Sequence, residues 1–406
     1  MPARAPGKYA VTFVFVTVFL DMAGFGLIIP VIPHLIEEVS RRDLAGSAFI
    51  AGWLSLAYGG MQFLFGPAIG NLSDAYGRRP VLLLSVFGMA ADHLLTALAP
   101  TLFWLFIARI ISGLCGASYS TANAYLADIT AAENRAKAFG MMGAAFGLGF
   151  VIGPAIGGLL GEFGPRVPFF AAAGLAGLNF LFGLLVLPET LPPESRRPFS
   201  FARANPIGTL KVFADYHGVA RLALVMFIYI FATSVYPAIW SFWGIARFGW
   251  SEATLGLTLA AFGLLTAIVQ GGLTGILVTW MGERATVVLG LVIAIVVAVG
   301  YGLAPGLAAV LILLVIHAPE GLVNPALTAI MSKQAPADAQ GELQGGIASV
   351  QSIAMLLGNL MFAQVFGYFM QPGAPVVTPN AAFYLSSALC CLSLAMFVGK
   401  RKTTGA

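Results

Sequence analysis

The stretch GNLSDAYGRRP, residues 70–80, is the most informative short segment of the chain, because a weaker copy follows 205 residues later. The copy reads GILVTWMGER, residues 275–284. The pairs that match at this offset include Gly70 with Gly275, Gly77 with Gly282, Arg79 with Arg284, Gly140 with Gly345 and Gly153 with Gly358. A repeat at a long fixed offset indicates internal duplication, so we expect two equivalent halves.

The composition places these halves in a membrane. Of the 406 residues, 59% are hydrophobic and 9% are charged, against about 25% charged in a typical soluble domain. Runs of about 20 apolar residues can cross a bilayer, and twelve such runs predict an all-α membrane protein. The expected spans are 9–36, 47–70, 81–99, 101–126, 137–160, 167–187, 219–245, 252–278, 285–304, 306–330, 341–369 and 381–399.

A polar stretch divides the twelve spans into six and six. Sixteen of the twenty-one Lys and Arg residues lie on the side that holds both termini, and four lie on the other. The positive-inside rule therefore places both termini in the cytoplasm. We expect an N-terminal six-helix half over residues 1–187, a cytoplasmic linker over 188–218 and a C-terminal six-helix half over 219–406. Many secondary transporters build a central site between two such repeats.

The loop at 70–80 is suited to a gate on the cytoplasmic side. Its two glycines permit a sharp turn, and the carboxylate of Asp74 can face the N-terminus of the eleventh span in the other half. Its two arginines can bind Asp128, at the end of the fourth span, and hold the cytoplasmic face shut in one state. The candidate gating residues here are Gly70, Asp74, Gly77, Arg78, Arg79 and Asp128.

The fifth span carries GAAFGLGFVIGPAIGG, residues 143–158. Its glycines remove side chains from much of the helix surface and allow close helix approach. Pro154 interrupts the helical hydrogen bonds and favours a kink. The pattern predicts a tight, bendable contact with the other half, so Gly153 and Pro154 join the gating candidates. Ordinary glycine-rich packing is the alternative interpretation.

Four charged side chains lie deep within the spans, and each needs an explanation. A charge at the centre of a membrane helix costs about 2.5–3.5 kcal/mol, so it usually faces a cavity or a partner. An apolar setting favours the protonated carboxyl, as a proton carrier requires. The proton-coupling candidates are Asp21 as the main carboxylate, Asp92 as a contributor to proton or substrate binding, Arg109 as a partner that neutralises an acid, and Glu320. A purely structural role is the alternative for each.

The chain resembles the major facilitator superfamily and, more narrowly, the bacterial drug/proton antiporters of the tetracycline-efflux type. The resemblance rests on the loop at 70–80 and on LDMAGFGLIIPVIPHL, RIISGLCGAS, GAAFGLGFVIGPAIGG, RFGW and PALTAIMS. It implies twelve helices in two pseudo-symmetric halves, proton-driven export, and a place in the bacterial cytoplasmic (inner) membrane. It also implies that Asp21 and Asp92 match membrane acids of these antiporters and that Arg109 matches an arginine of the fourth helix. The same resemblance links the glycine-rich fifth span to antiporters.

The second half departs from this family pattern. The resemblance implies an acid in the ninth span and a histidine in the eighth, but the matching positions hold Ala294 and Thr266. Instead, His317, Glu320 and Asn324 share one face of the tenth span. We interpret Glu320 as a second titratable or cation-binding acid, with a structural pair to His317 as the alternative. Because of these departures, the resemblance does not establish that tetracycline is the substrate.

Polar and aromatic residues within the spans are candidates for a substrate cavity. Apolar walls with few polar anchors suit an amphipathic organic compound, and helix packing is the alternative for each residue. Gln62 and Gln270 are the better candidates, because each lies well inside its span. The full set of substrate-binding candidates is Tyr58, Gln62, Asp92, Trp243, Gln270, His317, Glu320, Asn324 and Gln351.

The sequence therefore predicts a proton-coupled secondary active transporter that exports an amphipathic organic compound or drug by alternating access. The alternatives are a proton-coupled importer of a small metabolite and a non-transporting membrane sensor. The sequence has no Gly-x-x-x-x-Gly-Lys-Ser/Thr loop and no nucleophile–base or metal-ligand cluster, so we expect no ATP drive, enzyme activity or cofactor. The expected partners are protons, the small organic substrate and the lipid bilayer, but not nucleic acid. We expect the monomer to function.

Overall fold

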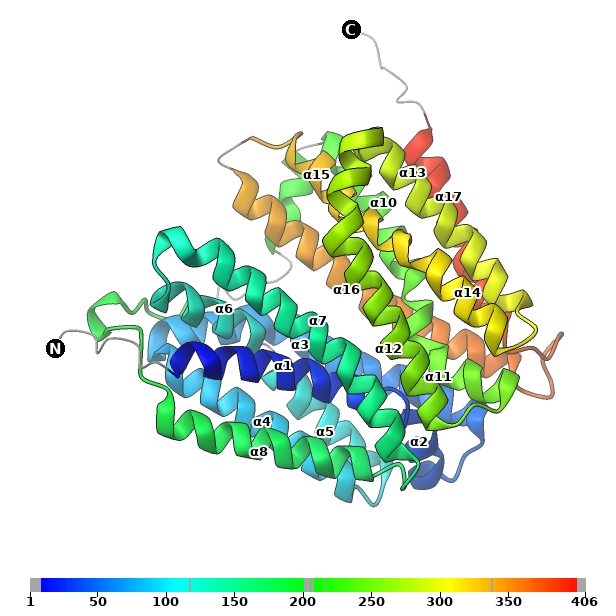
Figure 1. The fold of residues 1–406 in the computed structure, drawn as a ribbon, viewed down its shortest axis with the longest axis horizontal. Coiled ribbons are helices and arrows are strands. Elements are labelled where there is room, and N and C mark those ends of the chain that lie inside the picture. The colour runs from blue at the N-terminus through cyan, green and yellow to red at the C-terminus, as the bar shows by residue number, and fades with distance from the viewer. Residues whose placement is uncertain are drawn as a thin grey trace, which may run out of the picture. The chain divides into compact units, whose positions relative to one another are not determined.

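The computed structural model describes residues 9–116, 118–200, 205, 208–215, 217–336 and 339–399, and all regular structure in these ranges is helical (Figure 1). Helices dominate because a bilayer core offers no water to satisfy the backbone. The first half contains α1 (Ala10–Ile28), α2 (Ile32–Ser40), α3 (Leu44–Tyr76), α4 (Arg78–Leu98), α5 (Leu102–Cys115), α6 (Ser118–Ile129), α7 (Arg135–Gly161) and α8 (Val167–Val186). The second half contains α9 (Val212–Asp215), α10 (His217–Thr233), α11 (Val235–Phe248), α12 (Glu252–Ile268), α13 (Thr274–Leu303), α14 (Leu307–His317), α15 (Val323–Ser332), α16 (Gln340–Phe369) and α17 (Ala381–Val398).

The helices account for the twelve predicted spans. In the described part of the chain, ten helical stretches are long and apolar enough to cross a membrane. One of them, Glu252–Leu303, has 52 residues and would be about 78 Å long as a single helix, enough for two crossings. The fourth predicted span is formed by α5 and α6 in succession. The predicted fold class, an all-α membrane protein with two six-helix repeats, is confirmed.

The first predicted span, 9–36, is not one continuous helix. Helix α1 ends at Ile28, a turn follows, and α2 begins at Ile32. The turn contains Pro30, which has no backbone N–H to donate to the preceding turn, and Pro33 occupies the first turn of α2, where proline is tolerated. The break leaves α2 as a separate short helix that extends to Ser40.

The duplication is visible in the backbone. Gly77 and Gly282, which match in the repeat, both have positive φ angles, of 110° and 80°. Another pair at the same offset, Gly116 and Gly321, is packed alike. A Cβ on either glycine would lie 3.0 Å from the side-chain nitrogen of a glutamine, Gln62 in the first half and Gln270 in the second. The halves are therefore equivalent in local conformation as well as in sequence.

The contacts between residues divide the chain into two compact units. The first unit comprises Met1–Pro206 and Gly244–Gly263, and the second comprises Ile207–Trp243 and Leu264–Ala406. In the first unit, α1 packs along α7, α4 along α8 and α3 along α5; in the second, α13 packs along α17 and α10 along α16 (Figure 1). Residues 244–263 follow the predicted linker in the sequence, yet they pack with the first unit. The predicted division at residues 188–218 stays a prediction.

Candidate functional site

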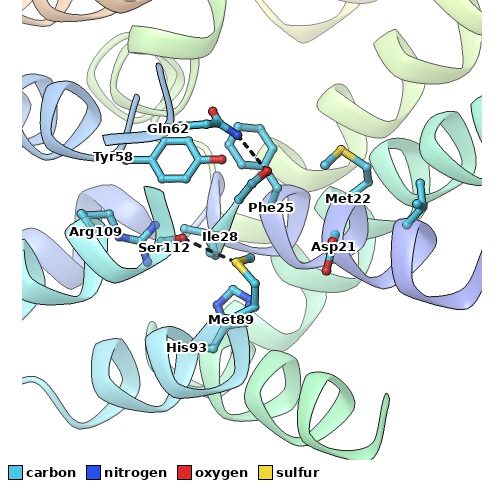
Figure 2. A pocket seen from close by; sticks show the side chains of 12 residues that line it. Asp21, Met22, Phe25, Ile28, Tyr58, Gln62, Met89, His93, Arg109 and Ser112 are labelled. Carbon is cyan, nitrogen blue, oxygen red and sulfur yellow. Dashed lines mark hydrogen bonds between the residues drawn. The ribbon is translucent and has the colours of Figure 1, made fainter. Parts of the chain in front are cut away.

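Four helices of the first unit enclose a pocket (Figure 2). The empty space of the pocket, including its open mouth, is about 580 Å³. Its wall is mostly apolar, with a few polar groups. The lining residues are Val18, Asp21, Met22, Phe25 and Ile28 of α1, Tyr58 and Gln62 of α3, Met89 and His93 of α4, and Arg109, Ser112 and Gly116 at α5.

Close packing of α3 against α5 positions the polar residues of the pocket. A Cβ on Gly113 would lie 2.3 Å from the Tyr58 carbonyl oxygen, so only glycine allows this approach. The side chain of Gln62 donates a hydrogen bond to the Gly116 carbonyl at 3.2 Å. The ring of Phe25 lies 6.4 Å from that of Tyr58, centroid to centroid. Four of the predicted residues, Asp21, Tyr58, Gln62 and Arg109, thus share one pocket.

Asp92 lies behind the pocket wall and is paired with Arg109. The Asp92 side chain has no exposed surface, and both its oxygens accept from one Arg109 nitrogen, at 2.9 and 3.1 Å. The same nitrogen donates to Thr96 at 3.2 Å. Arg109 therefore pairs with Asp92 and also lines the pocket, and its role in proton coupling stays a prediction. This geometry favours a positioning role for Asp92 over direct contact with substrate.

Our sequence analysis did not select His93. Its side chain is 3% exposed, yet it lines the pocket that also contains Asp21. Its Nδ1 lies 3.5 Å from an Asp92 oxygen, and a Cβ on Gly24 of α1 would be 3.0 Å from its Nε2. The only signal in the sequence is its position next to Asp92, which does not show that the ring turns toward α1.

The second unit holds another group of buried polar side chains. His317 Nε2 lies 2.6 Å from a Glu320 oxygen, and both side chains are about 95% buried. The Tyr229 hydroxyl donates to the other Glu320 oxygen at 3.2 Å, and the Tyr301 hydroxyl contacts His317 Nδ1 at 3.2 Å. Helix α14 ends at His317, and a 3-10 segment, Ala318–Leu322, continues the span. Glu320 is therefore buried inside the protein and paired with His317, the contact that the structural alternative describes.

The repeat relates this cluster to the pocket of the first unit. At the same offset, His317 corresponds to Ser112 and Glu320 corresponds to Cys115. Ser112 lines the pocket, and Gly116, which also lines it, corresponds to Gly321. The repeat positions of His317 and Gly321 therefore line the pocket, whereas Cys115, the repeat position of Glu320, packs toward Gly88 of α4.

The other predicted binding residues of the second unit have different surroundings. Gln351 donates to the Asn324 side chain at 2.7 Å, which joins α16 to α15. Trp243 is fully buried, and its indole N–H donates to Asn380 at 2.9 Å. The structure gives Trp243 a packing role, which does not favour the predicted contact with substrate. Gln270 lies in a π-helical turn, Val269–Leu273, beside Gly321.

The predicted gating loop is held by ion pairs within the first unit. Arg78 contacts Asp74 at 2.5 Å and Asp128 at 3.3 Å. The repeat positions of Arg78 and Asp128 are Glu283 and Lys333, which also pair, at 2.7 Å. The two halves therefore keep the same ion pair with its charges exchanged.

Arg79 differs from its prediction. It donates to the carbonyls of Leu187 at 2.6 Å and Leu184 at 3.1 Å, at the end of α8, rather than to Asp128. Arg78 alone reaches Asp128, because successive residues at a helix start point in different directions.

The structure adds Glu189, from the predicted linker, to the gating loop. Its two carboxylate oxygens accept the backbone N–H groups of Arg78 at 2.9 Å and Arg79 at 3.3 Å. These donors begin α4, where a helix has unsatisfied N–H groups and favours negative charge. The linker backbone also contacts the loop, since Arg197 N–H donates to the Asp74 carbonyl at 3.1 Å. The start of the linker therefore stabilises the loop conformation.

We expect Gly77→Ala to destabilise the gating loop strongly. The φ of 110° is strained for alanine, by about 1–3 kcal/mol, and the new Cβ would lie 2.2 Å from a Glu189 oxygen. Gly282→Ala is the matched control, because Gly282 has a positive φ but no neighbouring atom within 4 Å of the Cβ position. Thermal unfolding in detergent should show a lower midpoint for Gly77→Ala than for Gly282→Ala. Equal midpoints would show that the Glu189 contact has no role.

Gly153 and Pro154 contact α1 of their own half. A Cβ on Gly153 would lie 2.5 Å from the Ala23 carbonyl, and one on Gly26 would lie 2.5 Å from the Pro154 ring. The tight contact expected between halves is made one turn later, where Gly158 meets Gly256 of α12. Helix α7 continues through Pro154 to Gly161, so the proline does not divide it.

Two six-helix repeats with paired charges inside their membrane spans define a transporter-type integral membrane protein. The sequence profile of the Major Facilitator Superfamily matches residues 14–359. The chain belongs to this superfamily and, within it, to the group of the bacterial tetracycline resistance proteins.

Similar proteins come from several bacteria. The chain is 40% identical to the class C tetracycline resistance protein of Escherichia coli, with 86% of this chain and 88% of the relative covered. It is 33% identical to the class H protein of Pasteurella multocida, with 98% of each covered. Among solved structures, the human organic anion transporter MFSD10 (TETRAN) is 26% identical with a TM-score of 0.68, covering 96% of this chain and 99% of that one. The nucleoside transporter NupG, 14% identical with a TM-score of 0.75, covers 96% and 100% and shares the fold.

Proposed function

We propose that this protein is a proton-coupled secondary active transporter that exports an amphipathic organic compound or drug. The observation that carries the proposal is the pocket of the first unit, where Asp21 shares an apolar and aromatic wall with Arg109 and Gln62. Carbon-rich walls hold an amphipathic molecule, and the few polar groups orient it. The similarity to proteins named for tetracycline resistance supports a drug as the substrate class.

Asp21 is the proposed main proton carrier. It lies on α1, and its side chain is only partly buried in the pocket wall, so protons and substrate can both reach it. Substrate binding from the cytoplasmic side would displace its proton, and protonation from the other side would release the substrate. Arg109 is held by Asp92 and offers a fixed positive charge to the same pocket. Alternating access exposes the pocket to each side in turn.

Glu320 is the proposed second titratable acid. Its carboxyl is buried, and His317 and Tyr229 contact its two oxygens. A carboxylate so placed can exchange a proton with an imidazole without moving charge into lipid. It would compensate for the absence of an acid at Ala294, which is fully buried among apolar neighbours.

The remaining features of the proposal concern placement and partners. The excess of Lys and Arg on the side of the termini supports both termini in the cytoplasm and insertion in the bacterial inner membrane. The proton gradient drives the cycle, so the protein needs no cofactor and performs no chemistry on its substrate. The partners are protons, the substrate and lipid, and the monomer is the working unit.

A drug-panel proton-flux assay tests the proposed function. The full chain is reconstituted in proteoliposomes with a pH-sensitive dye inside, and amphipathic drugs, tetracycline among them, are added. We expect at least one drug to move protons across the membrane in the opposite direction to itself. A flux of drug and protons in the same direction would instead support the importer. The absence of any drug-dependent flux across the panel would contradict the exporter.

A further inference from the structure

The end of the first unit opposite the gating loop holds a group of contacts that belong to neither the pocket nor the gating loop. Helix α3 runs from this end, near α2, to the gating loop at its C-terminus. Three elements meet here: α2, the C-terminal end of α7 and the N-terminal end of α12. Helices α2 and α7 belong to the first sequence half and α12 belongs to the second, although residues 244–263 pack with the first unit.

The backbones of α7 and α12 touch at two glycines. A Cβ on Gly158 would lie 2.3 Å from the Glu252 carbonyl oxygen, and one on Gly256 would lie 2.1 Å from the Pro154 carbonyl oxygen. Neither glycine can be replaced without moving one helix from the other. At these two glycines the helices meet backbone to backbone, a close approach that small residues allow.

A carboxylate joins the two helices at the same place. Glu162, the residue after α7, accepts the backbone N–H of Ala253 at 3.0 Å. This hydrogen bond, followed by one from the Ser251 side chain, lowers the pKa of the Glu162 carboxyl. The first turn of α12 has N–H groups without helical partners, and a carboxylate there is favoured. Glu162 therefore supplies an N-terminal cap to a helix of the other sequence half.

An ion pair from α2 completes the group. His34 Nδ1 lies 2.7 Å from a Glu252 oxygen, and its Nε2 lies 4.0 Å from a Glu37 oxygen. The His34 and Glu252 side chains are 34% and 15% exposed, so the pair is partly shielded from water. This polar contact adds to the glycine crossing an interaction that a substitution such as His34→Gln or Glu252→Gln can remove with little change in volume.

We propose that His34, Glu252 and Glu162 form an outer latch, which holds the α7–α12 crossing closed and opens when the pocket is exposed on this side. The inference rests on the proposed alternating access, in which the two sequence halves move against each other. Contacts that join α2 and α7 to α12 must then break in each cycle. Because every latch group is polar and near water, the open state exchanges these contacts for hydration, so the latch biases the equilibrium without blocking it.

Thiol labelling of the full chain tests the latch without any drug. Met22→Cys places a reporter in the pocket, in a background of Cys115→Ser, Cys390→Ala and Cys391→Ala. A charged, membrane-impermeant methanethiosulfonate is added outside intact cells. We expect His34→Gln and Glu252→Gln each to raise the labelling rate about fivefold, the upper range for a partly shielded ion pair. The double variant should label no faster than either single variant, because one interaction is lost in all three.

Glu38→Gln is the matched control. It breaks the Arg166–Glu38 pair, 2.9 Å long, at the same end of the protein. Both partners belong to the first sequence half, so labelling should stay at the wild-type rate. The double variant His34→Glu with Glu252→His, in which the two side chains are exchanged, should restore slow labelling. Glu162→Gln should raise the labelling rate.

A wild-type labelling rate in both His34→Gln and Glu252→Gln would overturn the latch. So would an equal rise of the labelling rate in Glu38→Gln, or a double variant in which the effects of the two single substitutions add. Since labelling needs no substrate, an inactive wild type in the drug panel would contradict the proposed function alone, whereas unchanged labelling would contradict the latch alone.

Discussion

Asp21→Asn is expected to abolish coupling between drug and protons. An amide occupies nearly the same volume as the carboxyl but does not ionise, so drug-driven proton release should fall by more than about tenfold. Asp21 lines the pocket beside Met22 and Phe25, so drug binding itself should be less affected than proton release. Proton flux and drug binding are measured on the same proteoliposomes to separate these two effects.

Asp43→Asn is the control for this substitution. Asp43 is exposed and caps α3 by accepting the Gly46 N–H at 2.9 Å, a role that asparagine also fills. Its flux should match that of the wild type. If drug-driven proton release were equal in Asp21→Asn and the wild type, Asp21 would not be the proton carrier.

Arg109→Gln is expected to cause the largest loss of stability. It would leave Asp92, which has no exposed surface, as a buried charge without its main partner. Removal of one member of a buried ion pair typically costs about 3–5 kcal/mol. Denaturant titration in detergent micelles measures the free energy of unfolding, and Arg247→Gln, at an exposed arginine, should change it little.

The double variant Asp92→Asn with Arg109→Gln separates the contribution of the Asp92–Arg109 ion pair to stability from the contribution of Arg109 packing. With both charges removed, two amides can hydrogen-bond in the same space, so at least half of the lost stability should return. A double variant as unstable as Arg109→Gln alone would show that the guanidinium stabilises the protein through packing rather than through Asp92. Transport should remain impaired in either case, because the pocket loses its positive charge.

Much of the architecture could be predicted from local sequence. Apolar runs gave the spans, and the repeat anticipated that Gly77 and Gly282 would share a backbone conformation. The break after Ile28 was less predictable, because prolines 30 and 33 allow either a kink or a new helix. Asp21, Tyr58 and Gln62, all candidates from the sequence, line the same pocket, and their roles in transport stay predictions.

The partners of the charged residues could not be predicted in the same way. Arg79 reaches carbonyls of α8 rather than Asp128, and the fully buried Trp243 donates to Asn380. Glu189 looked like one acid of a polar linker, yet it caps α4. Each outcome depends on which helix packs against the residue and on the direction of its side chain. Neither can be read from a short stretch of sequence around that residue.

By itself, the sequence determined that this protein crosses a membrane twelve times in two related halves. Bilayer thickness sets the span length, and the apolar interior sets the composition, so both constraints act on consecutive residues. The tertiary structure alone decided that Asp92 meets Arg109, that Glu320 is buried with His317, and that His34 reaches Glu252. Desolvated charges bind whichever counter-charge the packed helices bring within reach, and only the packing of distant segments fixes that choice.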